Sequence, residues 1–107
     1  MERWEREQKE RILWEFPICW MCASRPALQL HHCIVHDMKR YHRELTTPEN
    51  LMPICEVCHT STEQIANDFI VRSRFALWQI ERGLDVVGWY RALNLKVKEQ
   101  WILELED

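Results

Sequence analysis

The chain has 107 residues, of which 47% are hydrophobic and 29% are charged, a composition typical of one small folded domain and not of a disordered chain. The formal net charge of −3 does not favour nucleic acid as a partner, and a chain with only 2 glycines lacks a glycine-rich phosphate loop. No apolar stretch approaches the roughly 20 residues of a membrane span, and the first residues are too charged for a secretory signal peptide, so we expect a cytoplasmic protein with no membrane partner.

The N-terminal third predicts a helix, a turn and strands, in that order. Residues 3–15 predict a helix, because isolated apolar side chains are spaced among charged ones with few helix-breaking residues. Pro17 ends this helix, since proline lacks a backbone N–H and disfavours helical geometry in the residue before it. Residues 18–26 predict a tight turn that carries two cysteines. Residues 28–36 alternate loosely between polar and apolar side chains and predict β-strands.

The middle of the chain predicts an exposed loop followed by one long helix. Residues 37–47 are polar, as in an exposed loop. The sequence Thr47-Pro48-Glu49 is a helix-start signal that opens a short turn, with a capping hydroxyl and a proline in the first turn. From Glu56 to Arg82 the apolar side chains recur near helical spacing, so we expect a single helix there.

The C-terminal part predicts a second helix and a tail of ambiguous structure. Gly83 is expected to end the long helix, and Asp85 is expected to cap a helix that runs to about Leu93. Residues 94–105 fit either a strand or a helix. The chain has no internal repeat and no low-complexity linker, so we expect a single domain over residues 1–107.

Four of the five cysteines form two CxxC pairs, Cys19/Cys22 and Cys55/Cys58, with 32 residues between the pairs. Each CxxC turn can present two thiolates to one ion, and two such turns complete a tetrahedral zinc site. A redox pair would need a thioredoxin-like context that this sequence lacks. We therefore predict a structural Zn²⁺ bound by these four cysteines, and we expect Cys33 to be a small buried thiol.

Three histidines and an asparagine lie between and beside the cysteine pairs. His31 and His32 follow the first pair, Asn50 precedes the second pair, and His59 directly follows Cys58. In this order and spacing the residues resemble the HNH nuclease family, whose fold is the ββα-metal fold. The resemblance covers roughly residues 19–63. It implies a metal-dependent endonuclease that hydrolyses DNA phosphodiester bonds.

The resemblance also implies a role for each matching residue. His32 matches the general base that activates water, and Asn50 matches the residue that holds the loop between strand and helix. His31 and His59 match ligands of a catalytic divalent cation, here Mg²⁺, Mn²⁺ or Ni²⁺, and the imidazole of His31 fits the colicin-type variant of the family. His59 could instead replace one cysteine at the zinc. Glu63, one helical turn after His59, is a possible further ligand of the catalytic ion, although a glutamate on a helix surface is the ordinary alternative.

The distribution of charge indicates where DNA would bind. The two ends of the chain are acidic, whereas residues 16–98 hold ten basic and eight acidic residues. Lys39, Arg40 and Arg43 form the densest basic cluster, and we expect them to contact mainly the phosphate backbone of DNA. A solvated loop is the alternative for this cluster.

Four other residues carry weaker expectations. His42 is at most a phosphate contact, and His36 has no assigned chemical role. Arg72 and Arg74 fit either an extension of the DNA path or a solvated helix face.

Together these features predict an α+β protein. Its small ββα-metal core, over about residues 17–65, is closed by the four-cysteine zinc and is flanked by an N-terminal helix and a helical C-terminal extension over about 66–107. The leading hypothesis is an HNH endonuclease, compatible with a phage or mobile-element protein that acts in a bacterial or phage-infected cell. One alternative is a non-catalytic zinc-containing module that binds DNA or protein. The other is a nuclease active only with a protein partner docked on the tryptophan-rich C-terminal helices.

Overall fold

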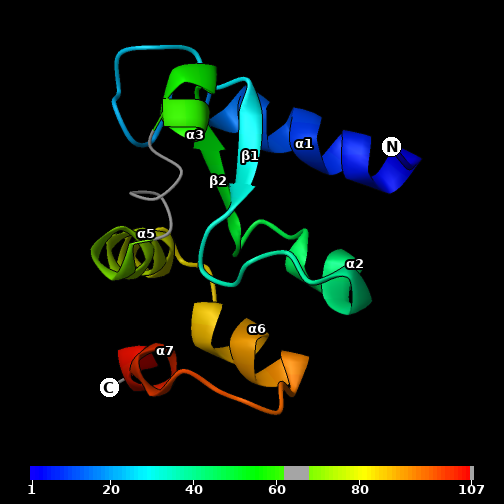
Figure 1. Cartoon of the computed structure of the whole chain (residues 1–107), viewed down its shortest axis with the longest axis vertical. Helices are drawn as coiled ribbons and strands as arrows, with labels where there is room; N and C mark the ends of the chain where they lie inside the picture. Colours follow the sequence, from blue (N-terminus) through cyan, green and yellow to red (C-terminus); the bar gives the residue numbers. More distant parts are fainter. Residues whose placement is uncertain (62–67, 107) are drawn as a thin grey trace.

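The computed structural model describes residues 1–61 and 68–106 and confirms a small α+β protein with two antiparallel strands and several helices (Figure 1). The predicted N-terminal and C-terminal helices are both present. Among the described residues, no helix combines the length and the apolarity that crossing a bilayer requires. The elements are α1 (Arg3–Glu15), β1 (Gln29–His32), the 3₁₀ turn η1 (Lys39–Tyr41), α2 (His42–Leu45), β2 (Leu51–Ile54), α3 (Glu56–Ser61), α5 (Phe69–Glu81), α6 (Val86–Leu93), α7 (Gln100–Leu103) and the 3₁₀ turn η2 (Glu104–Glu106).

Strand β1 is shorter than the predicted strand region over residues 28–36. It pairs with β2 in a register that sets His31 opposite Met52 and His32 opposite Leu51. Beyond His32, Cys33 N–H still donates to the Asn50 backbone carbonyl at 2.9 Å, and the pairing ends where the Asn50 side chain takes the following N–H groups. The Asn50 amide oxygen accepts hydrogen bonds from the backbone N–H groups of Ile34 and Val35, both at 2.9 Å.

Strand β2 lies outside the predicted strand region over residues 28–36. It contains Pro53, and a proline argues against an interior strand. In a sheet of two strands each strand is an edge, so the missing N–H of Pro53 costs no ladder bond on its outer side. The carbonyl of Pro53 instead accepts a hydrogen bond from Trp20 N–H at 2.9 Å. This bond joins the segment that carries the first cysteine pair to β2.

The prediction of one helix from Glu56 to Arg82 is wrong. Asp68 has an extended backbone (φ −66°, ψ 144°), and its side chain accepts a hydrogen bond from Ile70 N–H. An aspartate in this position is an N-cap, so a new helix, α5, begins at Phe69. Helix α3 is described only to Ser61, and the predicted ligand Glu63 lies outside the described residues.

The predicted end of α5 and start of α6 are confirmed. Gly83 follows α5 with φ 95°, a left-handed conformation that favours glycine. Asp85 caps α6, accepting a hydrogen bond from Gly88 N–H at 2.9 Å. The ambiguous tail contains the short helix α7 and the turn η2, and no strand is assigned within residues 94–106. The loop predicted over residues 37–47 holds η1 and α2.

The core joins the hairpin to the C-terminal helices. Buried side chains from the segment after β1, from β2 and from α5, α6 and α7 form one hydrophobic cluster that includes Ile34, Met52, Phe75, Tyr90 and Ile102. In Figure 1 these C-terminal helices lie at one end of the molecule, with α1, the hairpin and α3 at the other. The position of the hairpin therefore depends on the C-terminal helices.

Arg72, from α5, binds the segment that follows β1. Its Nε donates to the Ile34 carbonyl at 3.1 Å, and its Nη1 donates to a Glu99 carboxylate oxygen at 3.0 Å. The Arg72 side chain is only 14% exposed. Arg72 therefore packs within the fold, whereas Arg74 is exposed.

Replacing Arg72 with alanine is expected to lower the free energy of unfolding by about 2–3 kcal/mol, because the Ile34 carbonyl loses its partner and Glu99 loses its counter-ion. Urea unfolding followed by circular dichroism measures this. Arg74→Ala, two residues along the same helix, is the matched control and should change stability by less than about 0.5 kcal/mol. Equal effects of the two substitutions would contradict the assignment.

Candidate functional site

The four cysteines predicted to bind zinc form a cluster. The Sγ atoms of Cys19, Cys22, Cys55 and Cys58 all lie within 4.8 Å of one another. The Cys22 and Cys55 Sγ atoms are 3.9 Å apart, which agrees with the separation of about 3.8 Å expected for tetrahedral sulfurs each about 2.3 Å from a zinc ion. The cluster is therefore positioned to hold a metal such as zinc, and the donor set of four thiols fits that ion.

Local backbone structure brings the two cysteine pairs together. Cys19 N–H donates to the Arg25 carbonyl, and Ala23 N–H donates to the Cys19 carbonyl, which closes a tight turn around the first pair. Ala23 has φ 55°, a left-handed conformation that such a turn requires. The second pair begins directly after β2 and continues into α3, where Cys58 N–H donates to Cys55 Sγ at 3.3 Å.

Three cysteines have shifted pKa values. Hydrogen bonds from the side chain and backbone of Ser24 lower the pKa of the Cys22 thiol to about 6, whereas burial raises the pKa of Cys58, in the same cluster, to about 12. The thiolate is therefore favoured at Cys22. Cys33 lies outside the cluster and is fully buried. Burial raises the pKa of the Cys33 thiol to about 12, which agrees with its expected role as a small buried thiol.

A hydrogen bond determines which ring nitrogen of His32, the residue matched to a general base, carries the proton of the neutral imidazole. Its Nε2 lies 3.0 Å from Thr46 Oγ1, and this hydroxyl donates its only hydrogen to the His42 carbonyl at 2.6 Å. The hydroxyl must therefore accept from His32 Nε2–H, which leaves Nδ1 as the lone-pair nitrogen of the neutral ring. Burial lowers the pKa of His32, so the neutral form dominates at pH 7.

The adjacent His31 has different neighbours. Its ring centroid lies 5.9 Å from that of His59 on α3 and 6.4 Å from that of His36, both in edge-to-face arrangements. The structure thus brings together the two residues expected to bind a catalytic cation. His36 was given no role from sequence, and its place beside His31 follows from the turn after β1.

Asn50 is fully buried, and its side chain makes four hydrogen bonds. Besides accepting from the Ile34 and Val35 N–H groups, its Nδ2 donates to the Val35 carbonyl at 2.8 Å and to the Leu45 carbonyl at 2.9 Å. Asn50 therefore holds the backbone that follows His32 at the end of β1.

Thr47 does not act as the capping hydroxyl that the sequence predicted. The turn that it opens is present, because Asn50 N–H donates to the Thr47 carbonyl at 3.1 Å. Its buried Oγ1, however, has no hydrogen-bond partner among the described residues. The neighbouring Thr46 is the threonine whose hydroxyl contacts the histidines, and no local sequence signal distinguished the two.

His42 belongs to a charged network that sequence reasoning missed. Its Nδ1 lies 3.0 Å from Asp37 Oδ1, and its Nε2 lies 3.0 Å from Glu5 Oε2 on α1. The hydrogen bond to Glu5, and to a smaller extent the one to Asp37, raises the pKa of His42. The ligand atoms of His32, Asp37 and His42 also lie within 4.8 Å of one another. Because both nitrogens of His42 face carboxylates, we interpret this set as a protonated imidazole between two acids.

The stabilisation from His42 is expected to disappear at high pH. A histidine whose pKa is raised on folding stabilises the protein fully below its unfolded value of about 6.5 and loses that contribution as pH rises through the folded pKa. Urea unfolding should therefore show His42→Gln to be destabilised by up to about 1 kcal/mol at pH 6, a limit set by the partial exposure of the pair, and by less at pH 9.

His32 titrates with the opposite sign, since its lowered pKa removes stability as pH falls. Burial, the main cause of that lowering, is the same in both proteins, so most of the His32 effect cancels in the difference. A destabilisation by His42→Gln that grows with pH would contradict the network.

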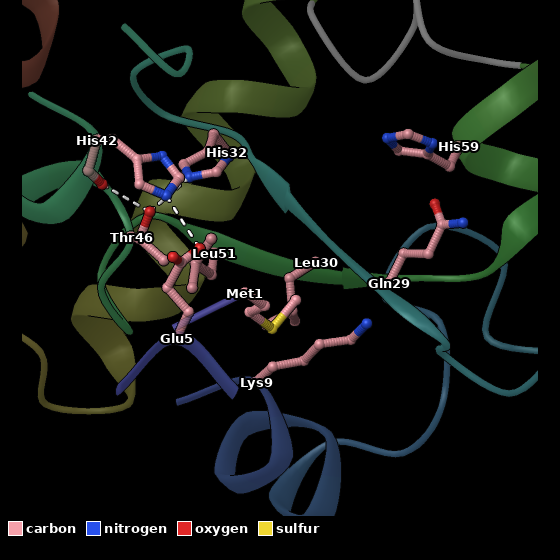
Figure 2. A pocket seen from close by; sticks show the side chains of 10 residues that line it. All are labelled: Met1, Glu5, Lys9, Gln29, Leu30, His32, His42, Thr46, Leu51 and His59. Atoms are coloured by element: carbon pink, nitrogen blue, oxygen red, sulfur yellow. Dashed lines mark hydrogen bonds and ion pairs between the residues drawn. The ribbon is translucent and has the colours of Figure 1, made fainter. Parts of the chain in front are cut away.

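His32, His42 and His59 line one cavity of about 380 Å³ (Figure 2). His32 and His42 lie toward one end and His59 toward the other, and side chains of α1 line one side. A second cavity, of about 350 Å³, is lined in part by the predicted basic cluster of Lys39, Arg40 and Arg43. The first cavity is lined by Met1, Glu5, Lys9, Gln29, Leu30, His32, His42, Thr46, Leu51 and His59.

Comparisons with protein-family models, with curated proteins and with solved structures found no match to this chain. The chemistry of the site therefore rests on its own geometry.

Proposed function

We propose that this protein is a metal-dependent endonuclease of the HNH type that hydrolyses DNA phosphodiester bonds. The observation that carries the proposal is one cavity lined by both His32, with its proton placed by Thr46, and His59, whose ring is 5.9 Å from that of His31. The order β1, β2, α3 beside a four-cysteine cluster supports a ββα-metal core.

In this proposal His32 accepts the proton of the attacking water. The neutral ring that its burial favours has a free lone pair on Nδ1, and the hydrogen bond from Nε2 to Thr46 keeps the ring in that tautomer. Asn50 fixes the backbone that follows His32, so the ring is presented from a rigid strand end. The base is thus neutral and oriented before substrate binds.

His31 and His59 are the residues that would hold a divalent cation in the proposed site. When bound, such an ion neutralises charge that develops on the phosphate and on the leaving oxygen. Imidazole ligands suit Mn²⁺ and Ni²⁺ as well as Mg²⁺. Glu63 stays a proposed further ligand. The four cysteines would hold a separate structural Zn²⁺.

Lys39, Arg40 and Arg43 are proposed to contact the DNA backbone. They line the second cavity, next to His42. Such contacts position a duplex without reading its sequence.

Nicking of a supercoiled plasmid by purified zinc-loaded protein tests the proposal. Mg²⁺, Mn²⁺ and Ni²⁺ are each added, and the wild type is compared with His59→Ala. We expect wild-type nicking with at least one ion and a loss of nicking in the variant. No nicking under any ion, or equal nicking by the variant, would overturn the proposal and leave a non-catalytic zinc-containing module.

A further inference from the structure

The two cavities meet at one ion pair. Among the residues that the structure describes, Glu5 and His42 alone line both cavities. Their contact, Glu5 Oε2 to His42 Nε2 at 3.0 Å, therefore stands between the proposed catalytic histidines and the basic cluster. A DNA strand that used both cavities would have to pass this contact.

Glu5 is the single carboxylate among the described residues that line the first cavity, and it lies there with two cationic side chains, Lys9 and His42. The carboxylate is directed at a cation, because the hydrogen bonds to Glu5 and Asp37 favour the protonated ring of His42. The same ring nitrogen could serve a phosphate oxygen, which is also an anionic acceptor.

The two carboxylates that contact His42 come from different parts of the fold. Asp37 lies five residues before His42, on the segment that leads into α2, whereas Glu5 comes from α1, 37 residues away in sequence. If Glu5 left, Asp37 would still keep the imidazole charged and oriented. Helix α1 has other contacts here, including Gln8 Nε2 to the Thr46 carbonyl at 3.3 Å and Arg43 stacked on Trp4, so the Glu5 side chain can move without undocking the helix.

We propose that His42 Nε2 is a phosphate-binding subsite for the DNA backbone, and that Glu5 occupies it as a competing anion in the free protein. This inference rests on the proposed function for the identity of the ligand.

Binding without cleavage tests the subsite. Inorganic phosphate and a 12-base-pair DNA duplex are titrated into zinc-loaded protein with no added divalent ion, and the imidazole resonances of His42 are followed by NMR. Glu5→Gln should bind both ligands about two- to fivefold more tightly, the range expected for losing a partly exposed competing pair. His42→Gln should weaken both, and the double variant should bind no better than His42→Gln.

Glu10→Gln is the matched control. Glu10 is an exposed residue of the same helix that lines neither cavity, and its substitution changes the net charge equally. Equal gains from Glu5→Gln and Glu10→Gln would overturn the subsite as a general charge effect, and so would phosphate binding that is insensitive to His42→Gln. A gain for inorganic phosphate with none for DNA would overturn the DNA backbone as its ligand.

Failure of the nuclease proposal is separable from failure of the subsite. A protein that binds DNA more tightly after Glu5→Gln but never nicks a plasmid loses the catalytic proposal and keeps the subsite.

Discussion

Replacing Cys55 with serine is expected to unfold most of the hairpin and α3 and to release the metal. Zinc binding contributes about 10–16 kcal/mol to the folding of small zinc sites, which is comparable to the whole stability of a domain, about 5–15 kcal/mol. Cys55 lies where β2 ends and α3 begins, so the loss of its thiolate affects both elements. Circular dichroism and the zinc content of the purified protein measure the effect.

Cys33→Ala is the matched control for this prediction. Cys33 is equally buried but lies outside the cluster, so the variant should keep its zinc and lose about 1–2 kcal/mol for the removed sulfur. A chelator that removes zinc from the wild type should reproduce the Cys55→Ser spectrum. Full retention of helicity and zinc in Cys55→Ser would contradict the four-cysteine assignment.

Replacing His32 with alanine is expected to abolish DNA cleavage while leaving the fold intact. Removal of a general base typically costs about 10²- to 10⁴-fold in rate. Because the folded pKa of His32 is lowered by burial, the wild-type rate should rise with pH, and the midpoint of that rise should lie below the usual histidine value of about 6.5. Single-turnover nicking rates across pH 5 to 8 measure both features.

His36→Ala is the matched control for this loss of an imidazole. His36 is exposed and lines neither of the two cavities described above. His36→Ala should therefore keep most of the wild-type nicking rate. A His32→Ala protein that cuts as fast as His36→Ala would refute the assignment of the base.

The parts of the structure that depend on short sequence spacing were predictable. The CxxC pairs, the end of α1 before Pro17 and the cap of α6 by Asp85 each depend on residues within a few positions of one another. Their geometry is set by local backbone chemistry, and the structure agrees with it. The proximity of the two cysteine pairs also follows, since a shared ion is the usual reason for two such pairs.

Other parts depend on contacts between distant residues and could not be predicted from one sequence. The charge on His42 depends on Glu5, which is 37 residues away. Strand β2 forms despite Pro53 because a two-stranded sheet makes no demand on its outer edge. The break before α5 depends on the extended backbone of Asp68, which overrides a hydrophobic spacing that fits a continuous helix.

The hydrogen bond from Arg72 to the Ile34 carbonyl bears on how far this chain can be shortened without losing its fold. Asn50 holds the N–H groups of the same segment, so the backbone beyond His32 is secured by the hairpin from one side and by α5 from the other. A fragment that stopped near residue 65 would keep every cysteine and histidine yet lose half of that support. We therefore expect the smallest fragment that folds on its own to extend beyond the stretch that holds the proposed site, and transplanting that site into another scaffold to require a substitute for Arg72.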